Sequence, residues 1–319
     1  MAVYTDVSAE DLASFLADYD IGEPHAFKGI AEGVENTNYY LQTAKGAFIL
    51  TLYEKRVRET DLPFFLDLME HLARRGIPCP TPLRRRDAAA YGLLNGRPAA
   101  ILAFLEGVSL RRPEPVHGRA AGRALAALHR AGMDFPARRA NALGHDAWAA
   151  FARSCAASAD TVQPGLAAMI VDEADFLARS WPKDLPRGVI HGDLFPDNVL
   201  FMGGTLSGLI DFYFACNDGL AYDLAVMINA WCFEPDGAFN VTKARSLIAG
   251  YEAGRALTVA ERAALPVLAR GAALRFLLTR LHDWLNQSPG ALVRPKDPKE
   301  FVPRLKFHQG VAGPEAYGL

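Results

Sequence analysis

Three side chains in the second half of the chain have the types and spacing that metal-assisted phosphoryl transfer requires. Asp193 is followed five residues later by Asn198, and Asp211 lies thirteen residues beyond Asn198. One carboxylate can orient an attacking hydroxyl and take up its proton, while an amide oxygen and a second carboxylate hold Mg²⁺ against the phosphates. The pattern therefore predicts Asp193 as the catalytic residue, and Asn198 and Asp211 as magnesium ligands.

The sequence around these residues predicts a strand, a loop and a hairpin. Three apolar runs are present, at residues 188–190, 198–202 and 206–211. Gly203 and Gly204 separate the last two runs and are typical of a tight turn. A hairpin returns the chain, so Asp211 is expected beside Asn198. The alternative is that Asp193 and Asn198 only cap turns, but the whole set at this spacing favours the metal site.

The first hundred residues predict an antiparallel sheet with one inserted helix. Ser8 and Asp11 form a capping-box pattern that opens a helix through about residue 19. Asn95-Gly96 is a two-residue hairpin signal. The expected strands are residues 25–31, 37–43, 47–53, 91–94 and 98–105, and the expected inserted helix is 60–76.

Alanine-rich helical segments dominate after Gly107. They are expected at residues 115–131, 146–158, 165–180, 220–231 and 258–286. We therefore predict an α+β, bilobal protein-kinase-like fold, with a small sheet lobe over residues 1–105 and a large, mostly helical lobe over 106–319. The tail 288–303 contains four prolines and is expected to be extended.

Composition narrows the class of protein. The chain has 319 residues, of which 22% are charged, and its net charge of −2 disfavours a nucleic-acid binder. Its four cysteines are scattered, which is typical of reduced thiols in the cytosol. The acidic first twenty residues do not fit a signal peptide, and no apolar run reaches the roughly 18 residues of a membrane span. We expect a cytoplasmic protein without a membrane or nucleic-acid partner.

The expected nucleotide-binding elements lie in the first lobe. The chain has neither G-x-x-x-x-G-K-[ST] nor G-x-G-x-x-G. The segment 28–38 joins the first two strands and suits a loop over phosphates, with the Asn36 and Asn38 amides as donors. An ordinary hairpin turn would look the same. The segment 101–107 fits the connector between lobes, where adenine would meet backbone groups near Ala103 and Leu105.

The cation that kinases carry on the third strand is not in its expected place. Thr51 stands where a Lys or Arg is expected. Lys55 or Arg56, just beyond the strand, could supply this cation instead. Both could equally be solvated charges at the end of the strand. The residue that clamps the phosphates is therefore left open.

These motifs together resemble the aminoglycoside phosphotransferase and choline kinase superfamily. The likeness rests on His191-Gly192-Asp193 with Asn198 and Asp211, on the helix end 125–129 and on the connector 101–107. Gly192 replaces the Arg of protein kinases, and no activation loop or A-P-E triplet follows Asp211. The resemblance implies ATP and Mg²⁺ as cofactors and a small-molecule acceptor.

Within this superfamily, three stretches resemble bacterial homoserine kinases. They are residues 33–39, 48–54 and 275–281. Thr51 lies in the second stretch, so its departure from the wider superfamily is expected there. The resemblance implies ATP-dependent phosphorylation of the side-chain hydroxyl of L-homoserine, a step of threonine biosynthesis.

An acceptor with a carboxylate calls for an arginine, because a guanidinium binds a carboxylate through two parallel hydrogen bonds. Residues 220–319 contain twelve Lys or Arg and nine Asp or Glu. Arg275 lies on a polar stripe of an otherwise apolar helix. We name Arg275, Arg280 and Trp231 as substrate-binding candidates. An ion pair of Arg280 with Asp283 and a core position for Trp231 are the alternatives.

Other functions use the same elements. The acceptor could be choline, ethanolamine, methylthioribose or an aminoglycoside, although choline favours an aromatic cage and no aromatic cluster identifies one. A protein kinase would phosphorylate peptides. A non-catalytic nucleotide-binding pseudokinase would lack a metal or base residue, whereas Asp193, Asn198 and Asp211 are all present.

Overall fold

The computed structural model describes residues 5–30, 36–54, 57–287 and 295–319, and the chain divides into two compact units. The first unit comprises the described residues of Met1–Gly107 together with Gly208–Tyr213. The second unit comprises Val108–Ser207 and the described residues of Phe214–Pro289 and Arg294–Leu319. Within the described residues, no helix is long and apolar enough to cross a membrane.

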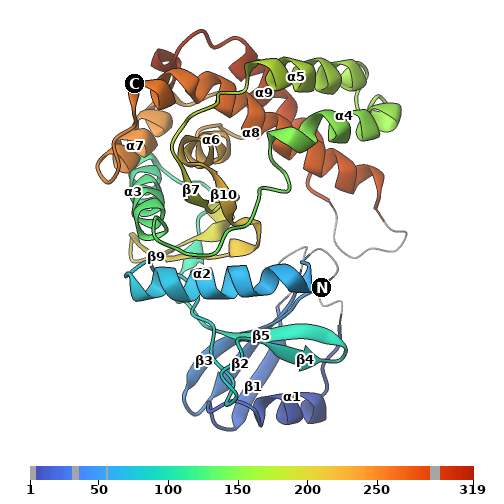
Figure 1. Ribbon diagram of the computed structural model, residues 1–319, viewed down its shortest axis with the longest axis vertical. Helices are drawn as coiled ribbons and strands as arrows, with labels where there is room; N and C mark the ends of the chain where they lie inside the picture. Colours follow the sequence, from blue (N-terminus) through green and yellow to red (C-terminus); the bar gives the residue numbers. More distant parts are fainter. Residues whose placement is uncertain (1–4, 31–35, 55–56, 288–294) are drawn as a thin grey trace. The chain divides into compact units, whose positions relative to one another are not determined.

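The first unit is built on a five-stranded antiparallel sheet in the order β1-β2-β3-β5-β4 (Figure 1). Its strands are β1 (Pro24–Gly29), β2 (Thr37–Thr43), β3 (Gly46–Leu52), β4 (Gly92–Leu94) and β5 (Arg97–Ala103). The Asn95-Gly96 turn joins β4 to β5 with positive φ at both residues, 50° and 73°. The hairpin predicted there is confirmed, because these are the backbone angles that a two-residue hairpin turn requires.

The two faces of this sheet differ in chemistry. Helix α1 (Ala9–Leu16) packs its Phe15 and Leu16 on one face, in a core with residues such as Leu50 and Ile101. The Ser8–Asp11 capping box opens this helix as predicted. Side chains alternate across a strand, so Thr51 and its cross-strand partner Asn38 lie on the other face. Thr51 and Asn38 make this second face of the sheet polar. Helix α2 (Leu62–Arg74) completes the unit.

The second unit is mostly helical. Its helices are α3 (Pro115–Ala131), α4 (His145–Ala159), α5 (Leu166–Ser180), α6 (Leu220–Trp231), α7 (Val241–Glu252), α8 (Val259–Leu285) and α9 (Phe301–Gln309). The remaining strands of the chain are β6 (Val108–Ser109), β7 (Arg187–Ile190), β8 (Val199–Met202), β9 (Thr205–Leu209) and β10 (Cys216–Gly219), and the last two residues of β9 are assigned to the first unit. They form a β6-β8-β9 sheet and a β7-β10 ladder. The strand and hairpin predicted around Asp193 are therefore confirmed.

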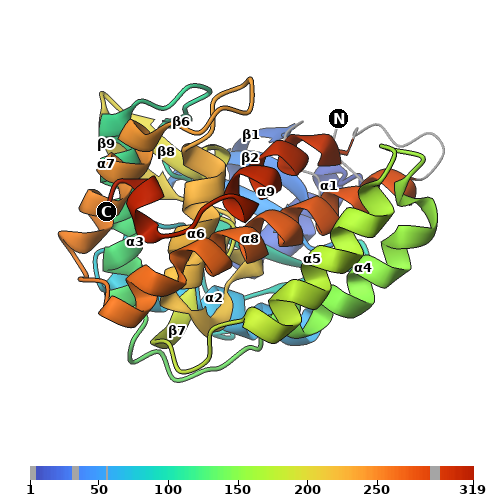
Figure 2. The ribbon, with the colours of Figure 1, turned by 90° about the horizontal axis from the view of Figure 1, so that it is seen from above.

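Helix α6 lies at the centre of the second unit. Almost every residue of α6 is buried, and α8 contacts α4, α5, α6 and α9 (Figure 2). Gly271 lets α8 approach two tryptophans, because a Cβ there would lie 2.4 Å from the Trp181 ring and 2.6 Å from the Trp148 ring. Asn229 on α6 donates to Ala269 of α8 at 3.0 Å. This packing fixes the helices that carry the site.

The tail was expected to be extended over 288–303, and this is wrong from Pro298 onward. Pro298–Glu300 forms a 3₁₀ turn and Phe301 begins α9. Phe301 and Leu305 are fully buried, so apolar burial favours the helix. Pro298 and Pro303 are tolerated because first-turn N–H groups have no partner within a helix. Residues 288–294 lie outside the described residues.

Candidate active site

The loop that carries Asp193 is held by a buried carboxylate. Asp223, near the start of α6, accepts hydrogen bonds from the backbone N–H groups of His191 at 2.7 Å and Gly192 at 2.9 Å. It also contacts Nε2 of His129 at 3.1 Å. The three residues that contact Asp223, which are His191, Gly192 and His129, are all buried. Asp223 of α6 and His129 of α3 therefore fix the start of the loop.

A chain of polar groups stabilises Asp223 from behind. Nδ1 of His129 lies 2.9 Å from the hydroxyl of Tyr251, and Arg255 donates to that hydroxyl at 3.0 Å. Burial alone would raise the pKa of Asp223. The hydrogen bond and charge of His129, with the charge of His191 and the Gly192 N–H, outweigh burial and hold the pKa of Asp223 below its ordinary value. Asp223 is therefore an anion in the folded protein.

Replacing Asp223 by Ala is expected to lower the free energy of unfolding by about 3–5 kcal/mol, because two buried N–H groups and His129 lose their acceptor. Urea unfolding at pH 7 measures this. A carboxyl whose pKa is lowered on folding stabilises the protein above its unfolded pKa, near 3.8, and loses that contribution as pH falls through the folded pKa. The gap between wild type and Asp223→Ala should therefore narrow below about pH 4. A gap that is constant down to pH 3 would contradict this assignment.

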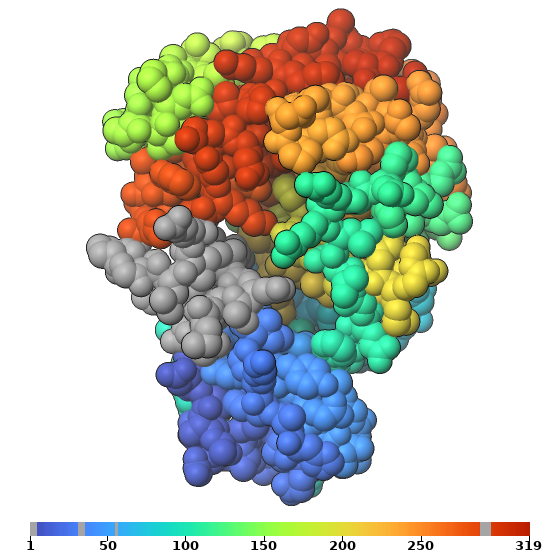
Figure 3. Space-filling model, turned by 180° about the vertical axis from the view of Figure 1, so that it is seen from behind, coloured from blue at the N-terminus to red at the C-terminus, as the bar shows by residue number. Residues whose placement is uncertain are grey.

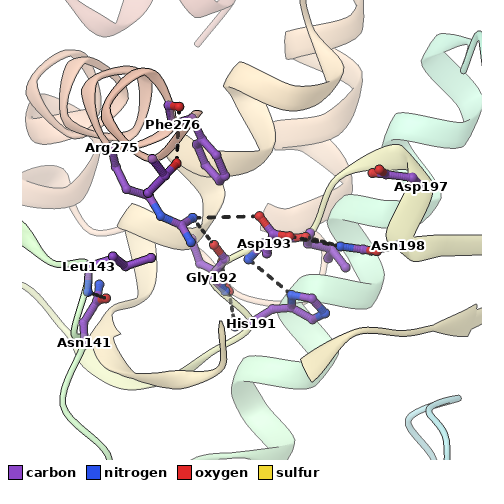
Figure 4. Close-up of polar contacts among 12 residues, drawn as sticks. Asn141, Leu143, His191, Gly192, Asp193, Asp197, Asn198, Arg275 and Phe276 are labelled. Carbon is purple, nitrogen blue, oxygen red and sulfur yellow. Dashed lines mark hydrogen bonds and ion pairs between the residues drawn. The ribbon is translucent and has the colours of Figure 1, made fainter. Parts of the chain in front are cut away.

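Asp193 and Asn198 are in direct contact in the second unit (Figure 4). Nδ2 of Asn198 donates to the backbone carbonyl of Asp193 at 2.8 Å and to its carboxylate at 3.3 Å. His191 accepts from the Asp193 N–H at 3.3 Å. These bonds leave the Asn198 amide oxygen as the atom suited to a metal. The Asp193 side chain is 20% exposed, so a small molecule can reach it.

Gly192 has a geometric reason to replace the arginine of protein kinases. Its φ is +75°, and a Cβ at this position would lie 3.0 Å from the carbonyl oxygen of Phe214. Any side chain is therefore strained there. The carbonyl of Gly192 instead accepts a hydrogen bond from Arg275 of α8.

Arg275 is buried against the catalytic loop. Only 5% of its side chain is exposed, and Nη1 lies 4.0 Å from the Asp193 carboxylate (Figure 4). Its guanidinium also lies over the Phe276 ring at 4.1 Å. The contacts of Arg275 are thus with the loop and with an aromatic ring, which suits a residue that orients Asp193. The substrate-binding role predicted for Arg275 stays a prediction.

Asp211 lies in the segment that belongs to the first unit. It has a φ of +65°, an uncommon conformation for a residue with a side chain. Two bonds of its neighbours fix the segment: Leu209 donates to Pro78 at 2.7 Å, and the hydroxyls of Tyr213 and Tyr53 lie 3.2 Å apart. Of the two predicted ligands, Asn198 belongs to the second unit and Asp211 to the first.

Thr51 lies on the polar face of the sheet, where its hydroxyl has a polar partner. The Thr51 hydroxyl is 1% exposed and donates to the amide oxygen of Asn38 at 2.8 Å. Asn36 uses its own amide oxygen to accept from the Glu54 N–H at 3.4 Å. With both oxygens engaged, the two NH₂ groups are the atoms that can donate to phosphates. The alternative cations Lys55 and Arg56 lie outside the described residues.

The connector offers backbone groups for a base. The N–H of Ala103 donates to Thr81 at 2.9 Å and that of Phe104 to Ala47 at 3.2 Å. In the described part of the chain, the Leu105 N–H has no such backbone partner. If Ala103 and Leu105 bind the nucleotide as predicted, Ala103 would do so through its carbonyl and Leu105 through its N–H.

The other two substrate-binding candidates have defined contacts. Arg280 pairs with Glu300 at 2.7 Å and donates to the Asp297 carbonyl at 3.3 Å. Trp231 is 3% exposed, and its indole N–H donates to the Leu194 carbonyl at 2.9 Å, next to Asp193. Trp231 thus braces the loop from α6.

The sequence also matches a known family. Residues 26–257 fit the model of the phosphotransferase enzyme family, a span that includes Asp193, Asn198 and Asp211. The chain belongs to this phosphotransferase family.

Close relatives of this phosphotransferase match over its whole length. A protein from Parvibaculum lavamentivorans is 61% identical over 100% of this chain and 99% of its own, and one from Nitrobacter winogradskyi is 63% identical over 100% and 98%. Each bears the name homoserine kinase.

Solved structures of phosphotransferases confirm the fold. A spectinomycin phosphotransferase in complex with ADP and spectinomycin has a TM-score of 0.73 and 16% identity, over 98% of this chain and 100% of its own. An amicoumacin kinase in complex with AMP-PNP and Ca²⁺ has a TM-score of 0.69 and 14% identity, over 95% and 92%. The α+β, kinase-like fold predicted from the sequence is therefore confirmed.

Sequence reasoning missed one part of this phosphotransferase site. It did not find the support of Asp223 by His129 and Tyr251, because these residues are far apart in the chain. Asp223 anchors α6 to the loop through its two hydrogen bonds with the backbone.

Proposed function

We propose that this protein is a homoserine kinase, which transfers the γ-phosphoryl group of ATP to the side-chain hydroxyl of L-homoserine. The observation that carries the proposal is the 58–63% identity, over the whole chain, to proteins named homoserine kinase. The product is an intermediate of threonine biosynthesis, as that name implies. The cytoplasmic location expected from the cysteine pattern stays a prediction.

The contacts of Asp193 suit the chemistry. Its carboxylate is partly exposed and is fixed by Asn198 and Arg275, so it can accept a hydrogen bond from the acceptor hydroxyl and then its proton. Catalysis consists mainly of positioning and charge stabilisation, because the transition state is loose.

The donor atoms of Asn198 and Asp211 fit Mg²⁺. Magnesium takes oxygen ligands, with few from the protein and the rest from phosphate and water. The amide oxygen of Asn198 and the carboxylate of Asp211 supply such atoms. When bound, Mg²⁺ would neutralise charge on the β- and γ-phosphates. We further propose that Asn36, Asn38, Ala103 and Leu105 bind the nucleotide.

The acceptor is tested by measuring Mg²⁺-dependent ADP release over a panel. L-homoserine, L-serine, L-threonine, choline, ethanolamine, methylthioribose and spectinomycin are compared at equal concentration. We expect kcat/KM for L-homoserine to exceed every other value by at least about 100-fold, because a buried polar site rejects ligands that leave its groups unpaired. A higher value for choline or for a sugar would contradict the proposal.

A further inference from the structure

A cavity of about 770 Å³ lies beside the catalytic loop, within the second unit. Its lining includes Pro196 of the loop, Trp231 at the end of α6, Phe233 just after it, and Arg304 of α9. In Figure 3 the surface is hollowed where the blue-green segment before α3, the orange segment after α6 and the red residues of α9 meet. Trp231 donates to Leu194, so the cavity wall is joined to the neighbour of Asp193.

Among the described residues, no carboxylate pairs with Arg304, a cation that lines this cavity. Nη1 donates to the Asn229 carbonyl at 3.0 Å, and the guanidinium lies 4.5 Å from the Phe301 ring and 5.6 Å from the Phe233 ring. In the described part of the chain, no carboxylate forms an ion pair with Arg304 within 4.0 Å. A guanidinium has five N–H donors, and one carbonyl leaves most of them available.

The other cations near this cavity are already neutralised or solvated. Arg280 pairs with Glu300 at 2.7 Å, and Lys243 pairs with Glu234 at 2.7 Å. Arg111 and Arg112 are exposed. Burial and, after it, the charge of Arg280 lower the pKa of Arg304 to about 10, with only Glu300 acting in the opposite direction. Arg304 is therefore charged at pH 7. The lining also includes the carboxylates of Glu234, Asp236 and Glu300, of which Glu234 pairs with Lys243 and Glu300 with Arg280.

We infer that Arg304 binds the carboxylate of the amino-acid acceptor. The inference rests on the proposed homoserine kinase function and names the residue that selects for that acceptor. A guanidinium held by a carbonyl and two rings is pre-oriented to form two parallel hydrogen bonds with a carboxylate. The apolar walls provided by Trp231 and Phe233 suit the methylene groups between carboxylate and hydroxyl. The carboxylate is thus assigned to Arg304 rather than to Arg275, which contacts Gly192 and Asp193.

The test compares two acceptors in wild type and Arg304→Met. L-homoserine has the carboxylate, and 3-aminopropan-1-ol keeps the ammonium and hydroxyl but lacks it. We expect Arg304→Met to lower kcat/KM for L-homoserine by roughly 100-fold or more, mainly through KM, because a desolvated charge pair is lost. The value for 3-aminopropan-1-ol should change by less than about 3-fold. Arg153→Met, at an exposed arginine of α4, is the control and should behave as wild type.

A binding measurement separates recognition from chemistry. L-2-aminobutyrate keeps the carboxylate and ammonium of homoserine but has no hydroxyl, so it binds without reacting. With AMP-PNP and Mg²⁺ present, its Kd should rise roughly 100-fold in Arg304→Met. In Arg304→Lys the charge remains but the two-pronged geometry is lost, so a rise of about 10-fold is expected. The Lys variant also keeps the test valid if the Met variant does not fold.

The outcomes distinguish the two proposals. A wild-type enzyme that does not phosphorylate L-homoserine would refute the proposed function itself. A wild-type enzyme that does, with unchanged L-2-aminobutyrate binding in Arg304→Met or Arg304→Lys, would refute only the assignment of Arg304. Equal losses of kcat/KM for L-homoserine and 3-aminopropan-1-ol in Arg304→Met, at unchanged Tm, would also refute the assignment of Arg304. Such losses would indicate a structural role.

Discussion

Replacement of Asp193 by Asn is expected to lower kcat by roughly 10²–10⁴-fold, the usual contribution of a general base. The amide keeps the shape of the carboxylate and an oxygen that can accept from Asn198, whose Nδ2 lies 3.3 Å away. It cannot accept the proton of the acceptor hydroxyl. Folding and nucleotide affinity should therefore change little, as checked by thermal unfolding and by AMP-PNP titration.

Asp197→Asn is a matched control for the Asp193 variant. Asp197 lies in the same loop, its side chain is 56% exposed, and it pairs with Lys296 at 2.9 Å. Exposed ion pairs contribute little, so kcat of Asp197→Asn should stay within about 3-fold of wild type. Turnover of Asp193→Asn as high as that of Asp197→Asn would remove the catalytic role from Asp193.

Asn198→Ala and Asp211→Asn are each expected to lower kcat/KM by roughly 10³-fold, because each removes a ligand of one shared ion. Residues that act as a unit have strongly non-additive effects. The kcat/KM of the double variant should therefore be only slightly below that of the less active single variant. This double-mutant cycle is checked by measuring single-turnover rates at saturating Mg²⁺ in the wild type, the two single variants and the double variant.

Additive losses would contradict this account of the metal site. If Asn198 and Asp211 served separate sites, their free-energy effects would sum, as they do for distant and independent positions. The losses would then multiply to about 10⁶-fold in the double variant. The outcome therefore tests whether Asn198 and Asp211 share one ion.

Local signals in the sequence predicted much of the fold. The Asn95-Gly96 and Gly203-Gly204 turns were found because each has the positive φ that its sequence favours. Helix α7 was missed although its signal is present: Asn240 caps it by accepting from the Lys243 N–H. Helix α9 was hidden by prolines, and only the burial of its apolar residues in the folded chain reveals it.

The contacts of the site also fall into two groups, those between residues close in the sequence and those between distant residues. Asp193 and Asn198 are five residues apart, so their spacing alone indicated their roles, and their contact is local. Arg275 reaches Gly192 from 83 residues away, and Arg304 reaches Asn229 from 75 residues away. These contacts depend on how α8 and α9 pack on α6, which no local pattern encodes. For this reason Arg275 was recognised as a polar residue on an apolar helix, but its contact with the loop was not.

The most direct test is a crystal structure of the protein with AMP-PNP, Mg²⁺ and L-homoserine. We predict one Mg²⁺ ligated by both Asn198 and Asp211, with the homoserine hydroxyl at roughly 2.6–3.2 Å from the Asp193 carboxylate. A hydroxyl bound away from Asp193, or an ion that contacts only one of the two ligands, would contradict the account.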